Sequence, residues 1–165
     1  MPHEQQMAIA ELEQRMRPGN FSSGGFLGAN ESLAEVLEED RNSLKQLGLT
    51  CHDLAGHLEN LIRAALQSKN HSTRVGHFTV TLTTFSGFQI CPWSPNPDQG
   101  QCRAGGGVRY GHLDWRITNE KRQITAQGPG LLVHLIRDHQ FFEGKASPYR
   151  ISPEDLAKLL DLNGR

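Results

Sequence analysis

The 165-residue sequence has little of several features that mark specialised classes of protein. Its three cysteines, Cys51, Cys91 and Cys102, are too few for the disulfide framework of a small secreted domain. No run of about 18 apolar residues is present, so we expect no transmembrane helix. The 17 basic and 18 acidic residues nearly cancel, which argues against a protein whose main role is to coat nucleic acid.

Targeting and catalytic motifs are also lacking. The first 17 residues are polar and have no apolar stretch of the kind that a secretory signal needs. Together with the low cysteine content, this predicts a cytoplasmic protein that does not bind membranes. A nucleophile elbow, a His-Glu-x-x-His helix, a phosphate-binding loop and a dinucleotide fingerprint are all missing. The pattern therefore favours a binding role over catalysis and leaves enzymatic activity uncertain.

What is present is an ordinary globular composition with an uneven distribution of charge. Residues 1–70 carry 10 acidic and 6 basic side chains, whereas residues 71–165 carry 8 and 11. The character of the chain changes near residue 70, where helical periodicity gives way to alternation. We therefore divide the chain into an acidic helical region, 1–70, and a β-plus-α region, 71–165, which also holds a candidate metal site.

Helix signals dominate the first region. Ser32 with Glu35, and Thr50 with Asp53, have the spacing of capping boxes, and each precedes a run of periodic leucines. Between them Gly48 stands where a glycine is expected after a helix end. The predicted helices are 4–17, 32–46 and 51–68, of which the last two form an αα-hairpin over 32–68.

The second region shows the alternation of half-buried strands. Phe78, Val80 and Leu82 alternate with threonines, and a similar pattern surrounds Trp115. The fold class is therefore predicted as α+β: an N-terminal helical hairpin followed by a small, mostly antiparallel four-stranded sheet with two C-terminal helices. The predicted strands are about 77–83, 88–91, 112–117 and 122–126, and the two helices are about 131–142 and 153–162.

The residues most suited to chemistry are Cys91, Cys102, His134 and His139. They form the pattern C-x10-C-x31-H-x4-H, and two thiolates with two imidazoles are a donor set that zinc prefers. Cysteines from the sheet and histidines from a helix resemble a Cys2His2 zinc finger in outline. The spacings of 10 and 31 residues are much longer than in that family, so no family is assigned. The sequence predicts a structural zinc site.

Several alternatives to this site remain open. Cys91 and Cys102 could be inert buried thiols or form a disulfide that closes the Pro/Gly-rich loop between them. On a regular helix His134 and His139 lie about 140° apart, so they share an ion only if the helix distorts or the ion lies beyond its end. His134 and Asp138 lie only about 40° apart and share a face.

The function predicted from these features is that of a zinc-binding interaction or regulatory protein with a protein partner. The alternative is a metal-dependent hydrolase that uses His112, Asp114, His134 and His139. Cys91 as a nucleophile is a further enzymatic alternative. The glycine-rich run 105–111, beside Arg103 and Arg116 and near Tyr110 and Trp115, could contact nucleic acid or a nucleotide, although two arginines and two aromatic residues are a small basis for this.

Overall fold

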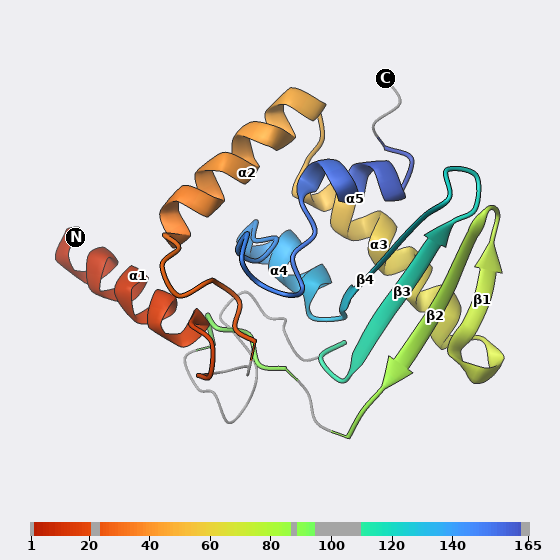
Figure 1. Cartoon of the computed structure of the whole chain (residues 1–165), viewed down its shortest axis with the longest axis horizontal. Helices are drawn as coiled ribbons and strands as arrows, with labels where there is room; N and C mark the ends of the chain where they lie inside the picture. The colour runs from red at the N-terminus through yellow and green to blue at the C-terminus, as the bar shows by residue number, and fades with distance from the viewer. Residues whose placement is uncertain (1, 21–23, 87–88, 95–109, 163–165) are drawn as a thin grey trace.

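The structure, a computed structural model, describes residues 2–20, 24–86, 89–94 and 110–162, and of residues 2–8 only the backbone. The chain folds into helices, an antiparallel sheet and further helices, which confirms the predicted α+β class (Figure 1). The elements are α1 (Pro2–Met16), α2 (Leu33–Leu47), α3 (Cys51–Leu66), the 3-10 turn η1 (Lys69–His71), β1 (Ser72–Val75), β2 (Phe78–Thr84), β3 (Leu113–Asn119), β4 (Ile124–Pro129), α4 (Leu132–His139) and α5 (Pro153–Leu159).

The four strands form one antiparallel sheet in the order β1-β2-β3-β4. Its register places Val80 opposite Ile117 and Leu82 opposite Trp115, so these apolar side chains share one buried face. Thr81 pairs with Arg116 on the other face, where both are exposed. The alternation predicted for these two strands is therefore confirmed, and the sheet has one packed and one solvated side.

Two details of the predicted strands are wrong. The segment 89–91 is not a strand; Gln89 N donates to Gly111 O, but no ladder follows. The first strand of the sheet is instead β1, a segment for which no strand was predicted. It escaped prediction because Ser72, Thr73 and Arg74 offer no apolar alternation, and only pairing with β2 makes this segment a strand.

The larger of two hydrophobic clusters lies between the packed face of the sheet and the helices. Helix α3 lies along β1 and β2, while α5 contacts β3 and β4, so both cover the same face. Residues from both sides of position 70 share this core. Its fully buried members include Leu54, Leu58, Ile62, Val80, Leu113, Ile117, Leu132, Ile136, Phe142 and Leu156.

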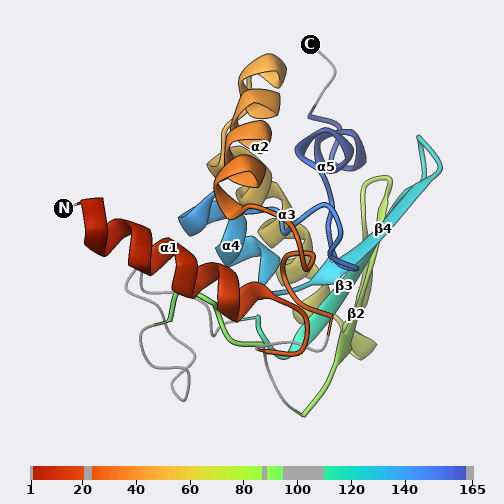
Figure 2. The ribbon, with the colours of Figure 1, turned by 60° about the vertical axis from the view of Figure 1, so that its left-hand side comes forward.

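The smaller cluster lies on the other side of α4, among α1, α2 and the loops (Figure 2). Residues from successive turns of α4 divide between the two: Leu131 and Leu135 enter the smaller cluster, whereas Leu132 and Ile136 enter the larger one. The smaller cluster contains Met16, Phe26, Leu27, Leu33, Val36, Cys91, Leu131, Leu135 and Phe141. Cys91 is therefore placed in a core made mainly of loops and helix ends.

Both ends of α2 and the start of α3 follow their sequence signals closely. Ser32 Oγ accepts from Glu35 N, and both bonds of the predicted Thr50–Asp53 capping box are made. Gly48 has a φ of 68°, a left-handed conformation that favours glycine. Beyond this turn the two helices diverge: α2 packs against α5, whereas α3 packs against α4 and the sheet (Figure 1).

Candidate metal centre

Three of the four predicted metal ligands meet at one point. His134 Nε2 lies 3.3 Å from Cys91 Sγ, and His139 Nε2 lies 3.4 Å from the same sulfur. One donor atom from each residue lies within 4.8 Å of the other two. Cys91 is fully buried, His134 is 8% exposed and His139 is half-buried. This cluster could hold a metal ion.

The end of α4 explains how two histidines five residues apart reach one sulfur. His139 is the last residue of the helix, and Gln140 then adopts a left-handed φ of 55°. Phe141 N turns back to donate to Leu135 O at 3.0 Å. The two imidazole rings stand perpendicular, with centroids 4.9 Å apart. The predicted angular separation is thus overcome at a helix end, where the side chain of His139 is no longer confined between helical turns.

The second nitrogen of His134 is held by Asp138. His134 Nδ1 lies 2.7 Å from Asp138 Oδ2, as their shared helix face predicts. The carboxylate favours the tautomer that carries its proton on Nδ1, because an ionised carboxylate can only accept. The lone pair of Nε2 then faces Cys91. A carboxylate behind a histidine in this way is the usual outer partner of a metal-binding imidazole.

His139 is oriented by aromatic contacts. Its ring stacks on Trp93, with centroids 4.0 Å apart and planes 5° from parallel, and Trp93 in turn meets Phe141 edge to face. Burial and the neighbouring His134 lower the pKa of His139 to about 4. Burial also lowers the pKa of His134. Both imidazoles are therefore biased towards the neutral form, the form that binds metal.

The backbone around Cys91 is fastened from another helix. Ser94 N donates to Cys91 O at 3.0 Å, which closes a turn through Pro92 and Trp93. Arg15, near the end of α1, donates to Pro92 O at 3.0 Å and to Ser94 O at 2.6 Å. This arginine joins α1 to the turn that carries the thiol, so the ligand position is set by two segments far apart in the sequence.

The spacing of the donor atoms suits a tetrahedral zinc ion. With Zn–S near 2.3 Å and Zn–N near 2.05 Å, tetrahedral geometry requires a sulfur-to-nitrogen separation of about 3.5 Å. The two observed separations, 3.3 and 3.4 Å, are close to that value. These two sulfur-to-nitrogen separations fit a shared ion, and the three donor atoms all lie within 4.8 Å of one another.

The other residues singled out in the sequence lie elsewhere. Cys102 falls outside the described residues. Among the described residues, His112 and Asp114 do not join the cluster, and Asp114 lies on the solvated face of the sheet. Cys51 lies at the start of α3, where burial raises the pKa of its thiol to about 11.

Trp93 contributes to the site but was not among the candidate residues. An aromatic residue two positions after a candidate ligand is well placed to cover the site. Its stacking partner, His139, is 46 residues away in sequence, so no local pattern could have identified the pair. Asp138, by contrast, carried a usable signal in its spacing of four from His134.

Comparison of the chain with protein-family models, with curated proteins and with solved structures found no match. Nowhere in the described residues is there a helix with both the length and the apolar character needed to cross a lipid bilayer. Any functional conclusion must therefore come from the geometry of the site.

Proposed function

We propose that Cys91, His134 and His139 bind a structural zinc ion, with Cys102 as the fourth ligand. In this proposal the metal fastens the segment that follows Cys91 to the end of α4. The protein would then be a zinc-stabilised interaction or regulatory module that presents its helices to a protein partner. The acidic outer side of α2, with Glu35, Glu38 and Glu39 exposed, is the surface we expect to be offered.

The observation that carries the proposal is the meeting of one sulfur and two imidazole nitrogens from segments 43 and 48 residues apart. Hydrophobic packing alone would not favour three polar donor atoms on one point. The carboxylate of Asp138 behind His134 supplies the outer contact that metal sites use. Zinc is preferred because a thiolate and two imidazoles form its usual donor set.

Elemental analysis of protein purified without chelators is the direct test. We expect about one zinc ion per chain, and we expect Cys91→Ser and His134→Ala to lose it. Cys51→Ser and His57→Ala are matched controls: Cys51 is a buried thiol away from the cluster, and His57 is an exposed imidazole on α3. A wild-type protein without metal, or zinc retained by both site variants, would contradict the proposal.

The role of Cys102 has a separate test. Replacement of zinc by cobalt gives a thiolate-to-cobalt absorption band whose intensity rises with the number of thiolate ligands. If Cys102 is the fourth ligand, Cys102→Ser halves this band and weakens metal binding. An unchanged band would show three protein ligands and an open fourth position, as in catalytic sites.

Asp138→Asn tests the outer contact without removing a ligand. The amide can offer its NH2 group to His134 Nδ1 and so favour the wrong tautomer. We expect zinc affinity to fall about 10–100-fold while the stoichiometry at saturating zinc stays at one. A chromophoric zinc chelator in competition measures this change. The matched control is Asp155→Asn, an exposed acid in the first turn of α5.

The metal-dependent hydrolase remains an alternative that draws no support from this geometry. It required His112 and Asp114 to converge with His134, and within the described residues they do not join the metal cluster. An open fourth position in the cobalt experiment would revive an enzymatic hypothesis, but with Cys91, His134 and His139 as the three ligands.

A further inference from the structure

A polar hollow on the solvated face of the sheet, remote from the metal cluster, lies over β2, β3 and β4. The register builds it: Thr81, Arg116 and Gln127 form one row across the three strands, and Thr83 with Asp114 form the next. Within the described part of the chain no helix covers this face, since α3 and α5 both pack on the opposite side.

Two opposite charges line this hollow without an ion-pair partner among the described residues. Asp114 is half-buried and Arg116 is exposed, and neither makes a hydrogen bond or an ion pair within the described residues. Burial raises the pKa of Asp114, because its charged form lacks water and a partner. Two positions apart on one strand face, the two Cα atoms are separated by about 7 Å, so both charges can address one small ligand.

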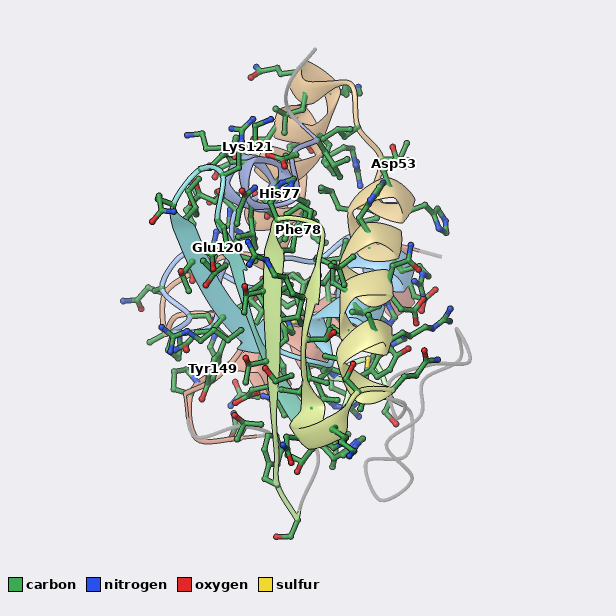
Figure 3. The ribbon with its side chains drawn as sticks, turned by 90° about the vertical axis from the view of Figure 1, so that its right-hand side faces the viewer. Asp53, His77, Phe78, Glu120, Lys121 and Tyr149 are labelled. Carbon is green, nitrogen blue, oxygen red and sulfur yellow. The ribbon has the colours of Figure 1, made fainter. Side chains whose placement is uncertain are left out.

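The segment before α5 forms one side of the hollow with a proline and a tyrosine. Pro148 and Tyr149 border it from the segment before α5, and Tyr149 is 39% exposed. In Figure 3, Tyr149 lies on the side of β1 and β2 away from α3, and towards the end of the sheet opposite His77 and Glu120. Two contacts hold this side of the hollow: Tyr149 N donates to Ser147 Oγ at 3.3 Å, and Arg150 makes a two-pronged ion pair with Asp40.

We propose that this hollow binds a free α-amino acid with an apolar side chain. Its ammonium group would donate to Asp114, its carboxylate would accept from Arg116, and its side chain would lie against Tyr149. Charge-assisted bonds of about 2.8 Å at each end and the short span between ammonium and carboxylate add up to about 8 Å. From Cα atoms about 7 Å apart, the long and flexible arginine side chain can place its guanidinium at this distance from the Asp114 carboxylate. The threonine hydroxyls and the Gln127 amide offer further polar contacts.

A zwitterion explains the hollow better than a neutral polyhydroxyl ligand does. Sugar hydroxyls could hydrogen-bond to Asp114 and Arg116, but the charge of the half-buried Asp114 carboxylate would still lack an opposite charge. An amino acid neutralises each charge with its opposite. An apolar side chain also suits the exposed ring of Tyr149, since contact with it removes apolar surface from water.

Titration of the full chain with L-leucine and L-phenylalanine, followed by amide NMR and calorimetry, tests the proposal. We expect dissociation constants tighter than about 10 mM, with shifts confined to residues that line the hollow. N-acetyl-L-leucine removes the ammonium, and L-leucinamide removes the carboxylate. Each should bind about tenfold more weakly, because each loses one charge-assisted bond. D-Glucose is the neutral polyhydroxyl probe and should not bind.

The variants Asp114→Asn and Arg116→Gln should each weaken L-leucine binding about tenfold and leave zinc content unchanged. Arg74→Gln is the matched control, because Arg74 lies on the same sheet but outside the hollow, where it donates to Gly76 O. The proposal is overturned if neither amino acid binds or if only D-glucose binds. It is also overturned if the two blocked forms bind the unmodified protein as tightly as L-leucine does, or if both variants bind L-leucine as tightly as the unmodified protein does. The zinc measurement keeps this result separate from the proposed function.

Discussion

The two hydrophobic clusters of this protein are stabilised in different ways. The larger one joins α3, α4 and α5 to a regular sheet, and its side chains come from elements with their own backbone ladders. The smaller one joins loops and helix ends, such as Phe26, Leu27 and Phe141, to α4. Beside the smaller cluster lie the Cys91 cluster and the bonds from Arg15 to the Pro92–Ser94 turn. The larger cluster has a buried carboxylate, that of Glu59 on α3, which accepts from Tyr110 OH and pairs with Arg137. The Asp40–Arg150 pair joins α2 to the segment before α5.

This difference shows where a small chain needs cross-links. Burial of apolar surface contributes most where a sheet already orders the backbone. Where most of a core is built from loops, the cost of ordering the chain is high relative to the area buried. A bound metal ion would add stability there beyond what packing contributes. We expect the loss of an ion pair, a metal ion or a capping bond to change the stability of the two clusters to different extents.

The largest effect is expected when the Asp40–Arg150 pair is broken. Both side chains are nearly buried, 4% and 13% exposed, and Arg150 also donates to Glu143 O at 2.7 Å. Asp40→Asn leaves a buried guanidinium without its charge partner, so we expect a loss of about 3–5 kcal/mol in the free energy of unfolding.

Urea denaturation measures this loss. The control is Glu39→Gln. Glu39 lies on the same helix as Asp40 but forms an exposed pair with Lys145, so its substitution should cost under about 1 kcal/mol. Equal effects of the two substitutions would contradict the expectation that a buried ion pair stabilises the fold more than an exposed one.

Removal of zinc should be next in size and local in character. If free zinc is about 100 times its dissociation constant, chelation lowers the free energy of unfolding by about 2.7 kcal/mol. In hydrogen exchange, the amides of Ser94 and Phe141 should lose protection, whereas those of Val80 and Ile117 in the sheet should keep theirs. Uniform loss across both clusters would show that the metal stabilises the whole fold rather than the smaller cluster.

The third expected effect depends on pH and concerns Glu143, which is fully buried. Its Oε1 accepts from Ser147 Oγ, its Oε2 is unpartnered among the described residues, and burial raises its pKa to about 8. Because this pKa lies above that of the unfolded chain, the native state holds a proton that the unfolded state releases. Stability contributed by the protonated acid is full below about pH 4.5 and is lost as pH rises through about 8, with a slope of up to about 1.4 kcal/mol per pH unit.

Glu143→Gln should abolish that slope, because the amide stays neutral. Urea midpoints of the parent and the variant, measured from pH 5 to 8.5 at fixed free zinc, give the difference. Parallel curves would mean that Glu143 is already ionised in the native protein across this range, as it is in the unfolded chain, and the burial argument would be wrong.

The smallest effect is expected from the capping residue at the start of α3, a helix that contributes to the larger cluster. Thr50→Ala removes the side-chain acceptor for Asp53 N and should cost about 1 kcal/mol. Because Thr50 lies outside the smaller cluster, its cost should be the same with and without chelator. Thermal melts of the four combinations measure this additivity. A larger cost in the chelated protein would indicate that the two clusters are coupled through α3 and α4.

Much of the fold could be predicted because its signals are local. Capping residues three positions apart and Gly48 after α2 predicted the ends of α2 and the start of α3 to within a few residues. Alternation predicted β2 and β3. Of the predicted strand 88–91, the described residues 89–91 are not a strand, and β1 was missed. A short run with apolar residues is not a strand without a neighbour to pair with, and a polar run becomes one when β2 supplies that neighbour.

For the candidate site, the residue types were predictable but their arrangement was not. Cys91, His134 and His139 were chosen for their chemistry, and regular helix geometry argued against a shared ion. The turn at Gln140 and the Trp93 ring resolve that conflict, and both depend on contacts across the tertiary structure. Asp138 was within reach of prediction because its bond to His134 spans a single helical turn.

By itself, the sequence determined the helix ends, the two faces of the central strands and the set of residues able to bind a metal. Each of these depends on interactions within about four residues or on side-chain chemistry alone. Only the tertiary structure decided which strands pair, which side of α4 each leucine faces and whether distant donor atoms meet. Those outcomes depend on contacts between segments tens of residues apart, whose energies come from burial shared by the whole chain.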